Sequence, residues 1–460
     1  MSKRSLLTLS SLALYSTTWA TPAYLPAGPN LTYGDVSNNQ TIISSVTNPA
    51  AGASVFTKDK NQYRFGILSS IGAGIEYGKV DDLFNELDKT QKDLQSNSFD
   101  VTSLAGCAPE SFVESTCKIS IAAKLNQDVI DPANRIIQLA EKDGNASIFL
   151  SGKVPLFPIV ISKEGWGGSF VLDANYSAKV NLTLLGDSIN KLDTSNLTSV
   201  VTLPTTPTGS ITYDLKNDSA LLLKAGAVGE VGLGYSRPIK LDTTNGNLYG
   251  GFRAKYYSVG LERLAQRLQS TTDSQDFFKD KDIRKDMENS SGFGVDLGAV
   301  WVAKHYRLGG WVDNLNKPSF SFNKVDVTGF TDPNIISRLS QDETYTMDPQ
   351  GHIEAALYSE SKNWVVSLGA DTNAVKDPVG QEYQWLTASA AYATDSWLIP
   401  GIRVGYRANN AATKLNYGSV GFTLFKCVTL DASASLDSVK IDGNSMPRSA
   451  MVNLGIELSF

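Results

Sequence analysis

The sequence predicts an all-β protein, an antiparallel transmembrane β-barrel of about fourteen strands. Long segments alternate between apolar and polar residues, which is the pattern of strands with one oily and one polar face. Only 19% of the residues are charged, below the roughly 25% of soluble chains, and 38 are glycines. After the first twenty residues, no apolar run of about 20 residues is present to form a transmembrane helix.

Composition also narrows the function. The net charge is -6 and no block of basic residues is present, so nucleic acid is not an expected partner. Two histidines and three cysteines leave little for metal or nucleophile chemistry. We therefore expect a non-enzymatic protein with no catalytic residues, no cofactor and no metal.

The first twenty residues have the pattern of a cleaved signal peptide. Lys3 and Arg4 form a positive start, residues 6–15 are apolar, and Ala20 ends a small-residue cleavage site. The sequence therefore predicts export and a bacterial outer-membrane location. Residues 21–61 lack regular alternation and precede the predicted barrel, residues 62–460.

Alternating segments account for most of the chain after residue 61. Many have nine or more residues, the length that a tilted strand needs to cross a bilayer. The predicted strands are 62–78, 146–161, 168–185, 219–236, 246–263, 292–303, 305–313, 351–359, 363–370, 384–393, 397–406, 416–424, 427–437 and 450–460.

The connections between these strands alternate in length. The first, third and later odd connections are long, whereas the even ones are short. Long loops on one rim and tight turns on the other are typical of outer-membrane barrels, with the long loops outside. Residues 211–216 are interpreted as part of a loop, because another barrel strand there would break the alternation. Residues 81–95 are predicted to form a short amphipathic helix.

The last predicted strand ends in a pattern that resembles the C-terminal signature of bacterial outer-membrane barrels. Its apolar residues include Leu454, Ile456, Leu458 and Phe460. We expect outer-membrane lipids and the barrel assembly machinery as partners.

Cysteines and histidines have structural interpretations. Cys107 and Cys117 share the first long loop, and two nearby loop cysteines in an oxidising compartment predict a disulfide. His305 and His352 begin predicted strands and are interpreted as interfacial residues.

Twelve charged residues fall on the predicted inward faces, seven acidic and five basic, so they can pair in a hydrated lumen. They are Glu76, Asp173, Lys179, Glu230, Arg253, Lys255, Asp296, Arg307, Glu354, Arg403, Asp431 and Glu457.

The segment before the first strand contains Asn48, Pro49 and Ala50. It looks like the Asn-Pro-Ala segment of FadL-type transporters, in which the N-terminal stretch forms a hatch inside a fourteen-stranded barrel. A barrel of eight strands is already filled by its own side chains, so fourteen strands leave space for such a segment. The resemblance therefore implies that residues 21–61 form a hatch, and a disordered periplasmic tail is the alternative.

A wider resemblance covers nearly the whole chain after residue 20. Residues 32–34, 48–50, 156–158, 232–238 and 314–318 are similar to the TraF-like outer-membrane family, which is associated with conjugal transfer. This family is distinct from the thioredoxin-like conjugation protein of the same name, whose Cys-x-x-Cys pair is not in this sequence.

Two functions remain open. The TraF-like resemblance implies a structural or interaction role at the outer membrane, with envelope or conjugation proteins as partners and residues 79–145 and 314–350 as contact surfaces. The FadL-like resemblance implies the alternative, transport of a hydrophobic small molecule through a hatch-plugged barrel.

Overall fold

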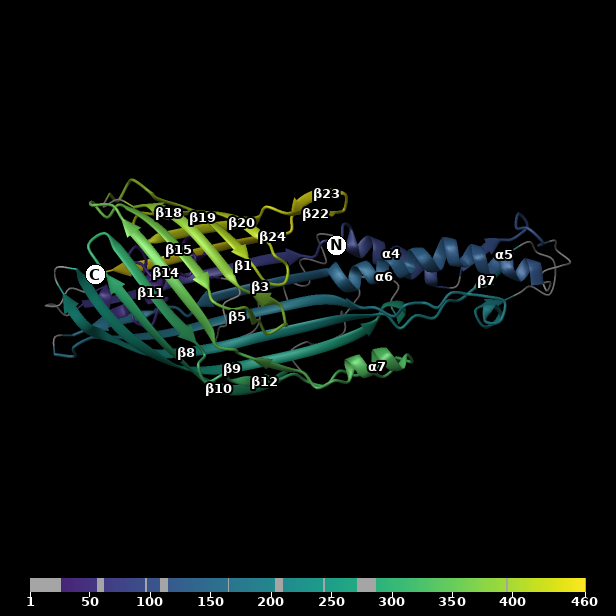
Figure 1. Ribbon diagram of the computed structural model, residues 1–460, viewed down its shortest axis with the longest axis horizontal. Coiled ribbons are helices and arrows are strands. Elements are labelled where there is room, and N and C mark those ends of the chain that lie inside the picture. Colours follow the sequence, from purple (N-terminus) through teal and green to yellow (C-terminus); the bar gives the residue numbers. More distant parts are fainter. Residues whose placement is uncertain are drawn as a thin grey trace.

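The protein is a closed antiparallel β-barrel with an extended projection at one end (Figure 1). The computed structural model describes residues 26–55, 62–95, 97–107, 115–163, 165–202, 210–242, 245–270, 287–393 and 396–459. The predicted signal peptide lies outside these residues, as does Phe460.

The barrel sheet contains fifteen strands within the described residues, and adjacent strands pair antiparallel. The first strand, β1, pairs with the last, β24, with Ile71 opposite Leu454, and this pairing closes the barrel. The strands are β1 (Gln62–Tyr77), β3 (Asn145–Lys153), β4 (Ile159–Ser162), β5 (Ser169–Leu185), β8 (Ala220–Asp242), β9 (Gly246–Arg267), β10 (Glu288–Val302), β11 (Tyr306–Asp313), β14 (Gln350–Tyr358), β15 (Trp364–Asp371), β18 (Trp385–Tyr392), β19 (Gly401–Asn409), β20 (Asn416–Leu424), β21 (Val428–Ser435) and β24 (Ser449–Ser459).

Strands β3 and β4 share one position in the wall. Both lie between β1 and β5, so the described sheet has fourteen strand positions, as predicted. The predicted continuous strand 146–161 is wrong in one respect, because it is interrupted at residues 154–158. Pro155 and Pro158 lack the amide hydrogens that a ladder requires. Irregular bonds bridge the gap: Leu156 donates to Ile67 O at 2.9 Å and Gly66 donates to Pro158 O at 3.2 Å.

The other strands confirm the predicted topology, with end points that shift by a few residues. The largest shift is in β8, which ends at Asp242 rather than at residue 236. The segment predicted as a loop at 211–216 contains β7 (Ser210–Tyr213), which belongs to a separate small sheet. The alternation of long and short connections is therefore preserved.

The outer surface of the barrel is apolar. Large hydrophobic side chains project outward from adjacent strands, including Phe252, Phe293, Leu308, Leu368 and Val404. Such an outward apolar band fits a lipid environment. Within the described part of the chain, no helix combines the length and the apolar character needed to cross a bilayer.

The wall is much taller on one side than on the other. Strand β8 has 23 residues and β9 has 22, whereas β18 and β21 have 8 each. A tilted strand needs about 9–11 residues to cross the hydrocarbon core. Strands β8 and β9 therefore extend well beyond the membrane, toward the projection in Figure 1.

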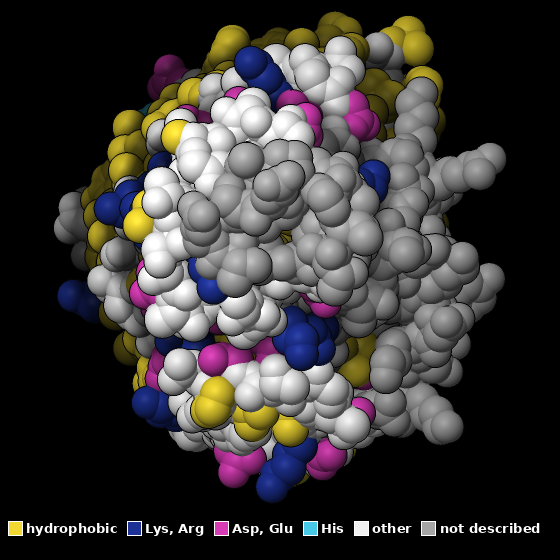
Figure 2. Space-filling model, turned by 90° about the vertical axis from the view of Figure 1, so that its right-hand side faces the viewer, with side chains coloured by type: hydrophobic (Ala, Val, Ile, Leu, Met, Phe, Trp, Pro, Cys, Tyr) yellow, Lys and Arg dark blue, Asp and Glu magenta, His cyan; other side chains and the backbone are white. Residues whose placement is uncertain are grey.

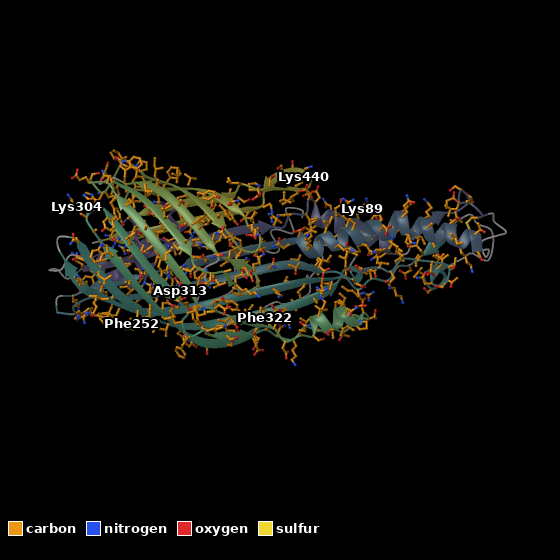
Figure 3. All side chains as sticks on the ribbon, in the orientation of Figure 1. Lys89, Phe252, Lys304, Asp313, Phe322 and Lys440 are labelled. Carbon is orange, nitrogen blue, oxygen red and sulfur yellow. A yellow bond between two sulfur atoms is a disulfide. The ribbon has the colours of Figure 1, made fainter. Side chains whose placement is uncertain are left out.

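The projection is built from the connections that follow β1 and β5. In Figure 3, Lys89 marks the projection and Lys304 marks the opposite rim of the barrel, where the short turns lie. Its elements are α4 (Leu83–Leu94), β2 (Asn97–Asp100), α5 (Ser115–Leu125), the π-helix η2 (Asn126–Ile130), α6 (Asp131–Asp143), the 3-10 helix η3 (Leu197–Ser199), β6 (Val201–Thr202) and β7. Helix α4 confirms the amphipathic helix predicted at 81–95.

The projection has a hydrophobic core of its own. Leu94, Ile121, Leu197 and Ile211 contribute to this buried cluster from both connections. The cluster also contains Cys107 and Cys117, which form a disulfide. A second cluster joins α4 and α6 to the outward face of β5 and β8 above the membrane. The helices thus cover apolar side chains that the lipid no longer covers.

The remaining loops fold over the outer mouth. Phe320, Phe322 and Tyr345 pack against Tyr257 and the rest of the inward face of β8 and β9. These loops contain the 3-10 helix η4 (Leu268–Ser270), β12 (Ser319–Ser321), α7 (Pro333–Leu339), β13 (Thr344–Thr346) and the hairpin of β16 (Val375–Lys376) with β17 (Glu382–Tyr383). A second hairpin, β22 (Ser438–Ile441) with β23 (Asn444–Pro447), lies beside the start of α4, where the Lys440 amide donates to Asp81 at 2.8 Å.

Asp218 ties the α7 loop to the tall wall. Its buried carboxylate accepts hydrogen bonds from the backbone of Thr331 and Asp332, and Arg267 lies 3.0 Å away. Burial raises the pKa of Asp218, but the hydrogen bonds and Arg267 outweigh it and hold the pKa below its usual value. The ionised carboxylate therefore stabilises this attachment.

We predict that Asp218→Asn loosens the α7 loop by about 1.5–3 kcal/mol, the usual contribution of hydrogen bonds to a charged group. Hydrogen exchange at Thr331 and Asp332 should accelerate. Because the pKa is lower in the folded state, the contribution is present above about pH 4 and is lost as pH falls through the folded pKa. Exposed Asp342 is the control, and equal exchange in Asp218→Asn and Asp342→Asn would contradict the prediction.

Candidate functional site in the barrel lumen

Residues 26–55, which we call the inner segment, lie against the inward faces of the barrel strands. The segment contains α2 (Asn30–Tyr33), α3 (Ile42–Val46) and the 3-10 helix η1 (Gly52–Ser54). Helix α2 contacts β18 to β21, α3 contacts β1, and η1 contacts β5 and β8. The segment therefore touches strands around much of the barrel.

The Asn48-Pro49-Ala50 turn is held by close contact with glycines of the wall. The Asn48 side-chain oxygen accepts from the backbone of Ala50 at 2.9 Å, and its amide donates to Ala299 O at 3.2 Å. A Cβ at Gly251 would lie 2.3 Å from Pro49 O, and one at Gly298 would lie 2.2 Å from Asn48 Oδ1. Only glycine lets the turn approach this closely.

Buried carboxylates of the wall hold other parts of the inner segment. Glu354 accepts hydrogen bonds from the backbone and hydroxyl of Ser37. Asp431 accepts from the Thr32 hydroxyl at 2.5 Å and also pairs with Arg403 at 2.8 Å. Some inward charges thus bind the segment as well as one another.

Some of the charges that the sequence places on inward faces pair with one another, and others pair with residues outside the predicted set. Lys255 pairs with Asp296 at 2.7 Å, and both residues belong to the predicted set. Asp173, in contrast, pairs with Lys153 at 2.5 Å, and Lys153 was not in that set.

A cavity of about 220 Å³ lies above the inner segment. Its floor is the inner segment, its sides are inward residues of the wall, and its roof includes the hairpin of β16 and β17. The lining residues that bear charge are Asp35, Lys153, Asp173, Glu230, Arg253, Lys255, Asp313, Asp348, His352, Asp371, Lys376 and Asp377.

The roof hairpin is anchored by a buried ion pair. Lys179 of β5 pairs with Asp377 at 2.8 Å and donates to the Tyr383 hydroxyl at 2.6 Å. Gly226 of β8 leaves room for the hairpin, because a Cβ there would lie 2.3 Å from Pro378 Cβ.

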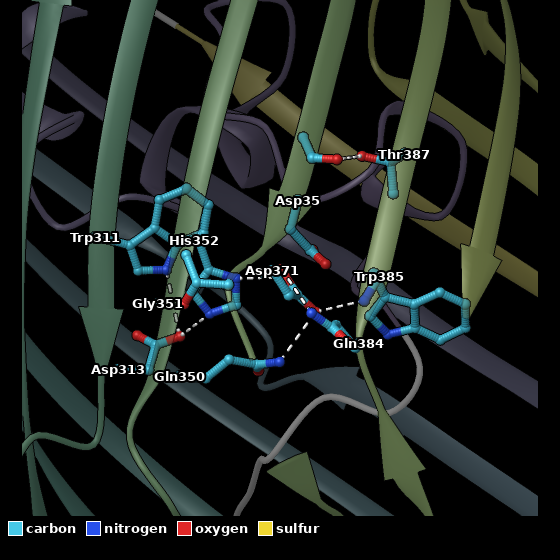
Figure 4. A network of polar contacts seen from close by, with 12 residues as sticks. Asp35, Trp311, Asp313, Gln350, Gly351, His352, Asp371, Gln384, Trp385 and Thr387 are labelled. Carbon is cyan, nitrogen blue, oxygen red and sulfur yellow. Dashed lines mark hydrogen bonds and ion pairs between the residues drawn. The ribbon is translucent and has the colours of Figure 1, made fainter. Parts of the chain in front are cut away.

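His352 is the centre of a polar network on one side of the cavity (Figure 4). Its ring stacks on Trp311 at 4.5 Å, its Nδ1 lies 2.8 Å from Asp371, and its Nε2 lies 3.3 Å from Asp313. Asp371 also accepts from Gln350 at 3.0 Å. Trp311, His352 and Asp371 are opposite one another in the strand register.

The interpretation of His352 as an interfacial residue is wrong, because the strand register turns its side chain into the lumen. His305 lies at the exposed short turn between β10 and β11, as expected of a strand-end residue. Within the described ranges, no group of three or more His, Cys, Asp or Glu side chains is arranged to hold a metal ion.

A closed barrel with an apolar outer band and a charged lumen defines an outer-membrane β-barrel protein. The chain matches the family described as "F plasmid transfer operon, TraF, protein" over residues 45–371, more than half of its length. It therefore belongs to this TraF family. No curated protein matches it.

Three examples illustrate the solved structures that have a similar arrangement. A mutant of the TodX monoaromatic hydrocarbon channel is 10% identical, with coverage of 96% of this chain and 99% of that chain and a TM-score of 0.39. The Ralstonia pickettii toluene transporter TbuX is 10% identical, with coverage of 95% and 99% and a TM-score of 0.38. A Pseudomonas aeruginosa FadL homologue is 11% identical, with coverage of 96% and 99% and a TM-score of 0.39. Sequence identities and TM-scores this low carry no information about what the chain binds.

We predict that Gly251→Val displaces the turn at Asn48-Pro49-Ala50, because the new side chain meets the backbone of Pro49. Single-channel conductance in planar bilayers should rise severalfold as the inner segment loosens. Gly250→Val is the matched control, since a Cβ at Gly250 meets only the flexible Ile239 side chain. Equal conductance of the two variants would contradict this role of the turn.

Proposed function

We propose that the protein acts as an outer-membrane anchor for a surface that binds another protein of the cell envelope. The observation that carries this proposal is the projection, which has a separate hydrophobic core and a disulfide but takes no part in closing the barrel. A rigid surface held away from the membrane suits recognition of a partner. The description of the TraF family favours a partner in plasmid transfer.

The end of the molecule that carries the projection has the surface expected of a protein contact. In Figure 2, basic and acidic side chains are interspersed among polar and hydrophobic ones on the described part of this face. Mixed charge of this kind favours a protein partner over a phosphate backbone. Helices α5 and α6 add the exposed apolar residues Ile119 and Leu139.

Residues 314–350, the other contact surface predicted from the sequence, are less suited to this role. Its aromatic residues are buried against the tall wall, and Asp218 holds the α7 loop in place. We therefore assign the contact to the projection, which the connections 79–145 and 186–219 form together.

We further propose that residues 21–61 form a hatch. The close packing of Asn48-Pro49-Ala50 against wall glycines supports this proposal, as do the carboxylates that bind Ser37 and Thr32. A segment so attached would block free diffusion through the barrel. The conductance of Gly251→Val tests this role.

Passage of a hydrophobic molecule is the second candidate function. The cavity between the inner segment and the outer loops supports it, since a plugged barrel with an internal cavity can pass a solute in steps. The charged lining favours hydrated contents, so we rank this function second.

The contact proposal predicts that Ile119→Glu with Leu139→Glu weakens partner binding. The exposed fraction of Ile119 is 58%, and loss of one buried isoleucine contact costs about 1.5–3 kcal/mol, or roughly tenfold or more in affinity. Donor cells that lack the native gene and carry this variant should transfer plasmid at a frequency roughly tenfold below wild type.

The matched control is Leu436→Glu with Met446→Glu, in the connection between β21 and β24. Leu436 has an exposed fraction of 69% and follows β21, so it belongs to neither α5 nor α6. Gel mobility with and without heating shows whether each barrel has assembled. Equal transfer by the two assembled double variants would overturn the contact proposal.

We also propose export with cleavage after Ala20, which the positive start and apolar run support. The expected mature N-terminus is Thr21, measured by mass spectrometry of outer-membrane fractions. Recovery of the chain with residues 1–20 attached would contradict this proposal.

A further inference from the structure

The cavity offers negative charge to a ligand more readily than positive charge. Lys153 and Lys255 line it, but their side chains are only 10% and 6% exposed, and each pairs with a carboxylate that is more deeply buried. By contrast, the side chains of Asp35 and Asp313 are 34% and 30% exposed. The accessible ionic groups on this side of the cavity are therefore carboxylates.

The other basic residues of the lining do not reverse this balance. His352 is held between Asp371 at 2.8 Å and Asp313 at 3.3 Å, so two carboxylates face one imidazole. Arg253 donates to Val46 O of the inner segment, so part of its guanidinium is already engaged. Lys376 belongs to the exposed roof hairpin at the outer mouth.

Among the described residues, the carboxylate of Asp35 makes only long polar contacts. The guanidinium of Arg407 lies 3.8 Å away, and the Asn30 amide lies 3.5 Å away. Both distances exceed the 2.7–3.2 Å of an ordinary hydrogen bond. Burial raises the pKa of Asp35 and Arg407 only partly opposes this rise. A cation in the cavity would compensate the carboxylate.

Asp313 is the second accessible carboxylate. Its Oδ2 lies 3.3 Å from both His352 Nε2 and Trp311 Nε1, again longer than an ordinary bond. It comes from the end of β11, whereas Asp35 comes from the inner segment, and Figure 4 shows the two on either side of the His352 network. The two carboxylates are therefore held at the cavity by different parts of the chain.

The rest of the lining suits the hydrocarbon part of a ligand. Ile43, Val46, Trp311, Tyr345 and Met347 border the same cavity. A volume of about 220 Å³ accommodates a small molecule rather than a polymer. A bare metal ion would leave these apolar side chains without contact.

We propose that the cavity binds a small organic cation, an alkylammonium or alkylguanidinium compound, whose charge the carboxylates of Asp35 and Asp313 compensate. An anion would be repelled by these carboxylates, and a neutral hydrocarbon would displace their water without replacing its hydrogen bonds, which costs free energy. This inference does not depend on the proposed partner contact.

The test uses three probes of matched chain length: n-pentylammonium, hexanoate and 1-pentanol. Each is titrated calorimetrically into the purified full-length protein in a non-ionic detergent at low salt. We expect pentylammonium to bind at least about tenfold more tightly than either other probe, a difference of about 1.4 kcal/mol. Tighter or equal binding of hexanoate or pentanol, or no binding of any probe, would overturn the proposal.

Variants locate the site. Asp35→Asn and Asp313→Asn should each weaken pentylammonium binding about tenfold, whereas Glu360→Gln, at an exposed short turn, should leave it unchanged. Asp313 lies on the wall, so its variant tests the site even where Asp35→Asn disturbs the inner segment. Unchanged affinity in assembled barrels of both aspartate variants would overturn the proposal.

Discussion

The pairing of β1 with β24 is the constraint on which the rest of the molecule depends. In lipid, each unpaired backbone group costs several kcal/mol, so a spanning sheet must close. Closure divides the side chains between two environments. In β10, for example, Phe293 faces outward and Asp296 faces inward. The inward charges then need partners, which neighbouring strands and the inner segment supply.

The same alternation explains the projection. Strands β5, β8 and β9 continue beyond the membrane, where lipid no longer covers their outward faces. Helices α4 and α6 cover these faces, while Phe320 and Phe322 cover the inward ones. The base of the projection therefore covers the extended barrel wall with protein in place of lipid.

The sequence was sufficient for the strands because period-two alternation is local. Pro155 and Pro158 indicate a break at 154–158. The alternation continues on either side of them, however, and it favoured one continuous strand. In contrast, the inward direction of His352 depends on register with Trp311 and Asp371. The Lys179–Asp377 pair joins residues almost 200 positions apart, and a loop has to fold into the lumen to form it. Such contacts leave no periodic pattern in the chain.

The bonds of the inner segment also have a consequence for the order of assembly. Thr32 binds Asp431, which is 399 residues away, and Asn30 accepts from Arg407. These partners lie in β19 and β21, among the last strands to be synthesised. Helix α2 therefore cannot complete its contacts with the wall until these late strands are present. Since β24 then closes against β1, the segment has to be inside the barrel as the final seam forms.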